Sequence, residues 1–472
     1  MPHIEQHGVA IIPECDRTSL PRDLISILIG SNLCLGVIIF GWLPVSFGLS
    51  WWPAVTSLVA GTVIGAMLTA PLALISFSTA TNLSTSSGAA FGVRGRLIGS
   101  FVGLLLSLGY IALTLWTGGD VMLNVLARIA GLIPGAVMHG IVYILLALCT
   151  VIIAIYGYRL LLLTSKFLAI GMIILMLFGF IAYAPSFTTS APSNTPYLLN
   201  SFWPTWLLSA VSAGLSGPVA FITLLGDYTR YISPLRHRSR HVLGATYLGL
   251  IAGLLIPQLF GTYVALASKA SLNFSSSLVS ASPSWYLIPL LLAAGVGSIG
   301  NAGVMLYSMG LDLDAIIPRS TRITATLIVA AVATIFVFLG HFIWDAQSAM
   351  TSFVLLLTAI GTPWAVITLI AHHRCNSEYD KQALQIYNRN ERGGIYWFYA
   401  GWNIQATTAW IIGAATGLCA VSTPLYEGPL IALTGRVDFS FVLSGITGGS
   451  VYLILLALRS KYKKPIFVIK DL

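Results

Sequence analysis

The stretch Gly109–Asn124, GYIALTLWTGGDVMLN, places an aromatic ring and an acid within an apolar segment that begins near Phe101. Trp116 and Asp120 are four residues apart, so in a helix they lie on one face, which Asn124 continues. Asp120 is the one acid that falls well inside a predicted membrane span, where an ionisable side chain is by default a candidate functional residue. An aromatic ring beside a carboxylate suits a flat solute that forms hydrogen bonds.

The composition of the chain predicts an all-α polytopic membrane protein. Of its 472 residues, 57% are hydrophobic and 8% are charged, and the mean hydropathy is +0.87. Charged residues make up about a quarter of a soluble domain, so a soluble fold is excluded. The five cysteines are scattered and form no CxxC pair, which argues against structural disulfides and a zinc site. No metal beyond a coupling Na⁺ is expected, and no signal peptide is recognised at the N-terminus.

Twelve apolar segments are long enough to cross the hydrocarbon core of a bilayer, which takes about 20 helical residues. They cover residues 25–49, 54–77, 101–125, 137–156, 160–183, 204–226, 242–267, 285–309, 323–344, 350–371, 396–420 and 439–458. The predicted domains are an N-terminal tail (1–22), a transmembrane transporter domain (23–458) and a C-terminal tail (459–472).

Basic residues gather on one side of these twelve segments. If the N-terminus is cytoplasmic, all of the 24 Lys and Arg residues except Arg128, Lys269 and Arg436 fall in cytoplasmic loops or tails. This asymmetry is the positive-inside signal, and it predicts a cytoplasmic membrane protein with both termini inside. The net charge of +9 is explained by this topology, so no nucleic-acid partner is expected.

Glycine and proline interrupt two of the segments. The first contains Gly30, Gly36 and Pro44, and the sixth contains Gly217 and Pro218. Helix breaks are tolerated in a membrane where the backbone faces protein or a cavity. The two segments are corresponding members of two five-span halves, and such a pair indicates a transporter site. The alternative is that the glycines only allow close helix packing.

Several motifs, in one consistent order, resemble the purine–cytosine permeases of the nucleobase–cation symporter family. The sixth segment reads GLSGPVAFITLLGDYTRYISP (214–234). The others are FGLSWWPA (47–54), SGAAFGVRGRL (87–97), NAGVMLYSMGLDL (301–313), TPWAVI (362–367) and GGIYWFYAGWNIQATTAWIIG (393–413). Each motif is weak alone, but together they span nearly the whole chain.

The resemblance implies a LeuT-like fold and a function. The fold has two inverted five-helix repeats, here 25–183 and 204–371, and two extra helices within 396–458. The function is secondary active symport of a cytosine- or purine-like heterocycle, driven by H⁺ or Na⁺. Other heterocycles carried within the family stay open as substrates, namely allantoin, a hydantoin or a hydroxymethylpyrimidine of the thiamine type.

The resemblance also implies site residues. In the family a tryptophan on the third helix stacks on the substrate, and a polar residue one turn later forms a hydrogen bond to it. Trp116 and Asp120 match these places, although the second is often an amide. Pro218 falls near the second stacking position on the sixth segment, with Phe221 as a substitute, and freed backbone groups near Gly217 are expected to form hydrogen bonds to the substrate. For Trp116 the alternative is core packing, and for Asp120 it is a buried structural acid.

The eighth segment supplies the remaining candidates. Asn301 is expected to bind substrate, the alternative being a hydrogen bond between helices. The resemblance places a cation between the first and eighth segments, with Gly36 and Ile39 opposite Ser298 and Asn301. Independently, burial of Asp120 would disfavour its charged form, which would suit a proton carrier. The second hydroxyl of the family's ion site is not evident.

Asp227 and Arg230, at the inner end of the sixth segment, are predicted to form a local pair or an inner gate (an acid at a helix C-terminus needs a partner). No clustered catalytic groups are readable, so an enzyme is not predicted. A receptor would carry a soluble signalling domain, and the loops are too short for one. A small heterocyclic solute and the lipid bilayer are the expected partners, and no obligatory protein partner is inferred.

Overall fold

The computed structural model describes residues 7–191, 196–270, 274–317, 321–342, 346–423, 425–434 and 437–462. The regular structure in these residues is helical, with four isolated β-bridges, so the predicted all-α class is confirmed. Five of the basic residues counted above lie outside the described residues: Arg319, Arg436, Lys463, Lys464 and Lys470.

Among the described residues, nine helical segments are long and apolar enough to span a membrane. They are α3 with η2 and α4 (Trp51–Thr79), α7 (Leu97–Ala130), α8 (Ala136–Tyr156), α9 (Tyr158–Tyr183), α13 (Ser239–Ser268), α15 (Leu287–Ile316), α16 (Arg322–Phe342), α17 (Ala346–Arg374) and α20 (Ser440–Tyr462). A tenth is broken into α1 and α2. The segment α10–α12 and the shorter α19 (Ile404–Cys419) complete an arrangement consistent with twelve crossings.

The first segment is interrupted as predicted. Helix α1 (Pro21–Asn32) and helix α2 (Leu35–Ser46) are bent by 64° relative to each other. Pro21 opens α1, where its missing N–H group is not needed. Cys34, directly before α2, has an extended backbone (φ −143°, ψ 163°). The helical hydrogen bonding of α1 therefore does not continue into α2.

The sixth segment is interrupted too. Helix α10 (Phe202–Ser209) passes into a π-helical turn, Ala210–Leu215, and then into the short α11 (Ser216–Val219); turns over 220–224 precede α12 (Leu225–Thr229). Pro218 cannot donate to the carbonyl four residues earlier, that of Gly214. The hydroxyl of Thr62 donates to this carbonyl instead, at 3.2 Å. A neighbouring side chain therefore satisfies the group that the proline leaves free.

Helix α13 contacts both halves of the broken first segment at close range. A Cβ atom on Gly253 would lie 2.5 Å from the carbonyl oxygen of Leu28 in α1. A Cβ atom on Gly261 would lie 1.9 Å from the carbonyl oxygen of Ile38 in α2. These two contacts require glycine, because any side chain would push the backbones apart.

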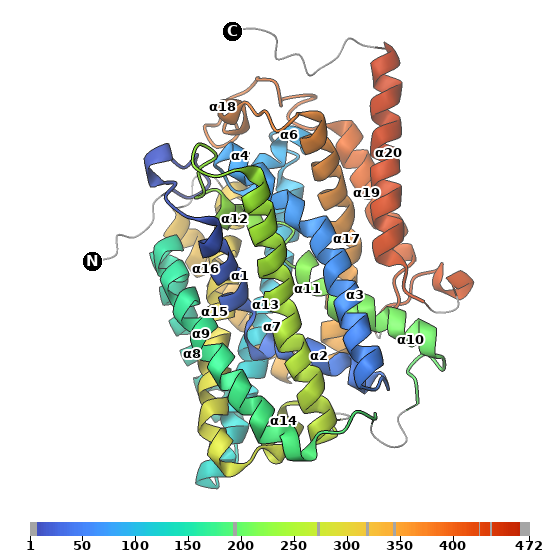
Figure 1. Ribbon diagram of the computed structural model, residues 1–472. Coiled ribbons are helices and arrows are strands. Elements are labelled where there is room, and N and C mark those ends of the chain that lie inside the picture. Colours follow the sequence, from blue (N-terminus) through green and yellow to red (C-terminus); the bar gives the residue numbers. More distant parts are fainter. Residues whose placement is uncertain are drawn as a thin grey trace.

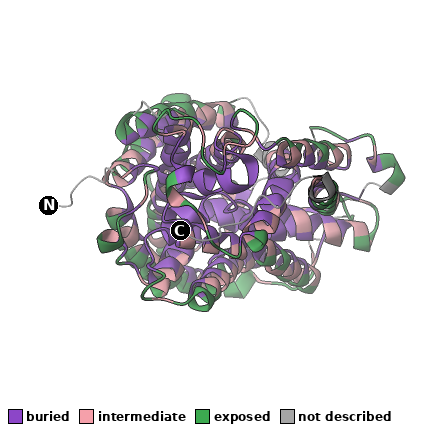
Figure 2. Ribbon diagram, turned by 90° about the horizontal axis from the view of Figure 1, so that it is seen from above, coloured by how far each residue is buried: buried purple, intermediate pink, exposed green. Residues whose placement is uncertain are grey.

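The bundle has two ends, which we call the terminal face and the distal face. At the terminal face α1 and α7 begin and α15 and α20 end; at the distal face α7 ends, α8 begins and α16 ends (Figure 1). Buried residues gather in the middle of the bundle and exposed ones at its rim (Figure 2). On α8 and α9 the exposed side chains are largely apolar, as expected for lipid contact; they include Ile141, Leu145, Phe167 and Ile170.

Candidate functional site

A small cavity lies where the two interrupted segments meet the middle of α7 and α15. We call it the central cavity. Its walls come from α1, α2, α7, α11 and the turn after it, α13 and α15. The lining residues are Asn32, Val37, Phe40, Tyr110, Gly217, Ala220, Phe221, Leu254, Gln258, Asn301 and Met305.

Aromatic rings form one part of the central cavity. The rings of Phe40 and Tyr110 stack, with centroids 5.9 Å apart and planes 28° apart. The hydroxyl of Tyr110 donates to the carbonyl of Ser216 at 3.3 Å, beside the break in the sixth segment. Phe221, on the turn after α11, is buried at the same cavity. Flat apolar faces of this kind suit a planar solute.

Amide side chains form the polar part of the central cavity. The Nδ2 group of Asn301 donates to the carbonyl of Ser31 at 2.8 Å, at the end of α1, and its Oδ1 atom accepts from the hydroxyl of Thr114 at 2.9 Å. An amide has two donor hydrogens and two acceptor lone pairs. Asn301 therefore keeps one donor and one acceptor position beyond these two bonds.

Gln258 is held in the same way. Its Nε2 group donates to the carbonyl of Ala213 at 2.8 Å, and its Oε1 atom lies 3.3 Å from the hydroxyl of Thr62, whose single hydrogen it shares with the carbonyl of Gly214. Its partners belong to α3 and to the π-helical turn, so the amide ties α13 to the sixth segment. The predicted Gly217, Phe221 and Asn301 line the central cavity, whereas the sequence did not point to Tyr110, Gln258 or Asn32. Pro218 packs its ring towards Gly65 of α3 and is not a lining residue.

Trp116 lies elsewhere. Its ring packs against Gly340 of α16, and it lines a separate apolar cavity of about 370 Å³ between α7, α16 and α17. Phe353 of α17 lines that cavity and contacts the ring of Tyr110 edge-on, at 6.2 Å between centroids. Trp116 and Asn301 thus line different cavities, although the sequence predicts that both belong to one site.

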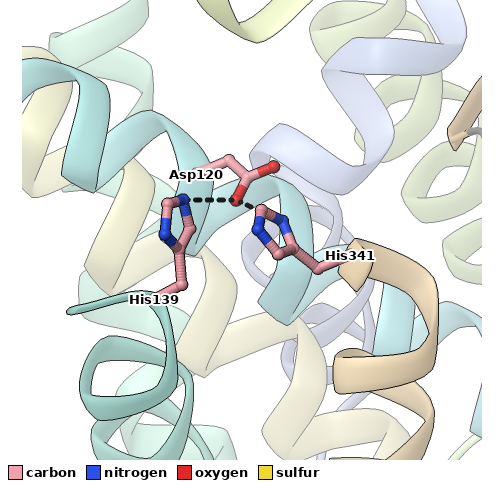
Figure 3. Close-up of side chains that lie close together, drawn as sticks. All are labelled: Asp120, His139 and His341. Atoms are coloured by element: carbon pink, nitrogen blue, oxygen red, sulfur yellow. Dashed lines mark ion pairs between the residues drawn. The ribbon is translucent and has the colours of Figure 1, made fainter. Parts of the chain in front are cut away.

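Asp120 is also apart from the central cavity. Its carboxylate lies beside His139 of α8 and His341 of α16, near the distal face (Figure 3). The hydroxyl of Tyr143 donates to the same carboxylate oxygen. Asp120 therefore does not line the central cavity, and its predicted contact with substrate stays a prediction.

The predicted cation ligands have different neighbours, except that Gly36 and Asn301 both contact Thr114. Ser298 turns its hydroxyl towards Gly118 of α7, while its neighbour Gly297 is the residue that faces the backbone of Leu33. Gly36 packs against Thr114, and Ile39 is buried in the apolar core. Asn301 alone of this set reaches the end of α1.

The predicted gate residues lie at the terminal face. The guanidinium of Arg230 donates to the carbonyl of Gly8 at 2.5 Å and to the hydroxyl of Tyr307 in α15 at 2.9 Å. The next residue of the N-terminal segment, Val9, donates its N–H group to Asp314 of α15 at 3.2 Å. Asp227 is buried nearby on α12. Arg230 thus joins α12, the N-terminal segment and α15 across the end of the bundle.

A comparison with known families shows the family to which the chain belongs. Residues 11–448 match the family model described as permease for cytosine/purines, uracil, thiamine and allantoin. The chain belongs to this permease family. The permease is 21% identical over 468 residues to a Bacillus subtilis (strain 168) protein named "Putative purine-cytosine permease YxlA", and the match covers 97% of both chains.

Solved structures show which fold the chain adopts. Mhp1, a nucleobase-cation-symport-1 family transporter, in a closed conformation with bromovinylhydantoin bound, matches 98% of the permease and 97% of its own chain, with a TM-score of 0.73 and 17% identity. Its inward-facing conformation gives a TM-score of 0.71 at 17% identity, over 99% and 96% of the two chains. A Na⁺-coupled sialic acid symporter gives 0.60 at 16% identity, over 96% and 92%.

These findings confirm the family resemblance and the LeuT-like fold. The family model and the Bacillus subtilis relative also confirm that the chain is a membrane permease and not an enzyme.

Proposed function

We propose that the permease imports a cytosine- or purine-like nucleobase and binds it in the central cavity. The observation that carries this proposal is the meeting of aromatic rings and amide side chains at both helix breaks. A nucleobase has two flat faces, which Tyr110, Phe40 and Phe221 can contact. Its edge carries donors and acceptors, which match the amides of Asn301 and Gln258. The name of the Bacillus subtilis relative supports a purine or cytosine as substrate.

Transport would proceed by alternating access. The central cavity is small in this structure, so a base enters only when the helices around it separate. Residues 25–183 and 204–371 would act as the two inverted repeats, with the extra helices in 396–458. Cation binding that favours one conformation would link an ion gradient to uptake. The Na⁺-coupled and nucleobase–cation relatives support coupling to a cation, H⁺ or Na⁺.

The terminal face would be the cytoplasmic one, with both tails inside the cell. Arg94, Arg96, Arg236 and Arg374 all belong to connections at this face, whereas Arg128, at the distal face, donates to carbonyl groups of the 279–282 segment. This distribution follows the positive-inside rule. The polar bonds of Arg230 would then close the cytoplasmic end.

The test is uptake into proteoliposomes of the purified permease. We expect labelled cytosine or a purine base to accumulate above its external concentration when a H⁺ or Na⁺ gradient is imposed, and the two gradients are applied separately to identify the ion. Unlabelled uracil, allantoin, a hydantoin and a hydroxymethylpyrimidine serve as competitors. Uptake that ignores both gradients contradicts symport, and competition only by a non-nucleobase contradicts the proposed substrate.

Asn301→Leu keeps roughly the side-chain volume and removes the amide. We expect the dissociation constant of the transported base to rise about 10- to 100-fold, because a lost hydrogen bond that leaves a buried partner unpaired costs about 1–3 kcal/mol. Equilibrium binding to purified protein measures this. Asn124→Leu, on α7 and outside the central cavity, is the control and should leave the affinity unchanged. Equal losses in both variants would contradict a direct role for Asn301.

A further inference from the structure

A second site lies outside the central cavity, where α7, α8 and α16 meet near the distal face. It consists of Asp120, His139 and His341, and Figure 3 shows the three side chains pointing towards one another from three helices. His341 is the last residue but one of α16, and His139 is in the first turn of α8. We call these residues the distal triad.

The three side chains offer metal-ligand atoms at suitable separations. The Oδ1 atom of Asp120 is 3.2 Å from Nδ1 of His341 and 3.8 Å from Nε2 of His139. One ligand atom from each residue can be chosen so that all three lie within 4.8 Å of one another. Ligands about 2.0–2.1 Å from a tetrahedral ion are about 3.3–3.4 Å apart, so a small inward shift would bring all three into contact with one cation.

The hydrogen bond made by Nδ1 of His139 leaves its Nε2 atom facing the carboxylate of Asp120. Its Nδ1 atom is 3.0 Å from the carbonyl oxygen of Gly135, which can only accept, so Nδ1 carries a hydrogen. In the neutral ring the lone pair is then on Nε2, the atom that faces Asp120. Two electron-pair donors that face each other need a positive charge between them, which a proton on Nε2 or a bound metal ion supplies.

The surroundings hold the ligands in place. The hydroxyl of Tyr143 donates to Oδ1 of Asp120, and the carbonyl of Gly135 orients the ring of His139. Partners of this kind, behind the ligands, fix the orientation of metal-binding side chains. The rings of His139 and His341 are stacked, with centroids 4.3 Å apart. The side chains of the triad are 15–22% exposed, which leaves access for an ion and for water as a further ligand.

We propose that the distal triad binds a divalent transition-metal cation of the Zn²⁺ class. Two imidazole nitrogens and one carboxylate oxygen are the ligand set of an open zinc site, and imidazole selects Zn²⁺, Ni²⁺ or Cu²⁺ over Mg²⁺ and Ca²⁺. The bound cation ties together α7, α8 and α16, helices that also contact one another pairwise. It therefore stabilises this part of the bundle, and none of its three ligands lines the central cavity.

The experiment is a Zn²⁺ titration of the purified, tag-free permease by calorimetry and by thermal unfolding, after treatment with a chelator. We expect one high-affinity Zn²⁺ ion per chain and a rise in the unfolding temperature that Mg²⁺ does not produce. His139→Ala and His341→Ala should each weaken binding at least 100-fold, and Tyr143→Phe, which leaves the ligands intact, 10- to 100-fold.

The matched control is His241→Ala. His237 and His241 are four residues apart where α13 begins and form another possible imidazole pair, at the opposite end of the bundle. The control variant should retain the Zn²⁺ affinity of the natural chain. The unfolding temperature without metal reports whether each variant is folded. Zn²⁺ binding that survives both His139→Ala and His341→Ala in folded protein would overturn the proposal, as would the absence of binding to the unaltered chain.

Discussion

Replacing Tyr110 by alanine should raise the dissociation constant of the transported base about 10- to 100-fold. Tyr110 lines the central cavity and stacks on Phe40, so its ring can contact a flat substrate. Alanine substitution of a ring that stacks on a base typically costs about 1–3 kcal/mol. Equilibrium binding of the labelled base measures the effect, and Tyr110→Phe should retain most of the affinity because the ring remains.

Trp116→Ala is the control that separates two assignments of the stacking residue. Trp116 belongs to the apolar cavity against α16, so its loss should change the affinity by less than about threefold, the change expected from about 0.6 kcal/mol. A large loss of affinity in Trp116→Ala together with a small one in Tyr110→Ala would contradict the central cavity as the binding site. It would restore the assignment expected from the sequence.

Replacing Arg230 by glutamine should open the terminal face. The guanidinium donates to Gly8 and to Tyr307, and hydrogen bonds of a charged group contribute about 1.5–3 kcal/mol each. Losing them would shift the equilibrium away from the closed terminal face by at least tenfold. Cys34, buried at the break between α1 and α2, is a natural reporter, because a thiol reagent reaches it only when the bundle opens.

The measurement is the rate at which a small maleimide modifies Cys34 in a variant whose other cysteines are serine. We expect modification of Arg230→Gln to be at least ten times faster than that of the background. Arg236→Gln removes an exposed arginine of the same face and should leave the rate unchanged. Unchanged labelling of a folded Arg230→Gln variant would show that Arg230 does not hold this end closed.

The sequence predicts the architecture well because the features that determine it are local. Long apolar runs predict spans whatever their neighbours are, and glycine and proline mark the breaks near Cys34 and after Pro218. The candidate residues on the breaks, Gly217 and Phe221, line the central cavity for the same reason.

The sequence could not predict which aromatic residue of α7 faces the central cavity. An aromatic residue followed by a polar one four positions later occurs twice on this helix, as Tyr110 with Thr114 and as Trp116 with Asp120. The two pairs are six residues apart, which is about 240° around the helix and about 9 Å along it. Which pair faces the centre depends on how α7 packs against α15 and α16, and no short pattern encodes that.

The distal triad also depends on helix packing, so the sequence could not predict it. Asp120 is noticeable in the sequence as an acid in an apolar run, but His139 and His341 are 202 residues apart, near the ends of two other helices. Only the packing of α8 and α16 against α7 brings the three side chains together. Asp120 was therefore identified as unusual from the sequence, while its surroundings were not.

The two close contacts of α13 have a mechanical consequence. Gly253 holds the backbone of α13 close to α1, and Gly261 holds it close to α2. The continuous helix α13 is therefore packed tightly against both parts of the bent first segment. The angle between α1 and α2 at Leu33 and Cys34 cannot change freely while α13 stays straight. Pro257 lies between the two contacts and interrupts the hydrogen-bond ladder of α13 there. Any change of the 64° angle between α1 and α2 must therefore be accompanied by bending of α13 at Pro257, so that the two breaks move together.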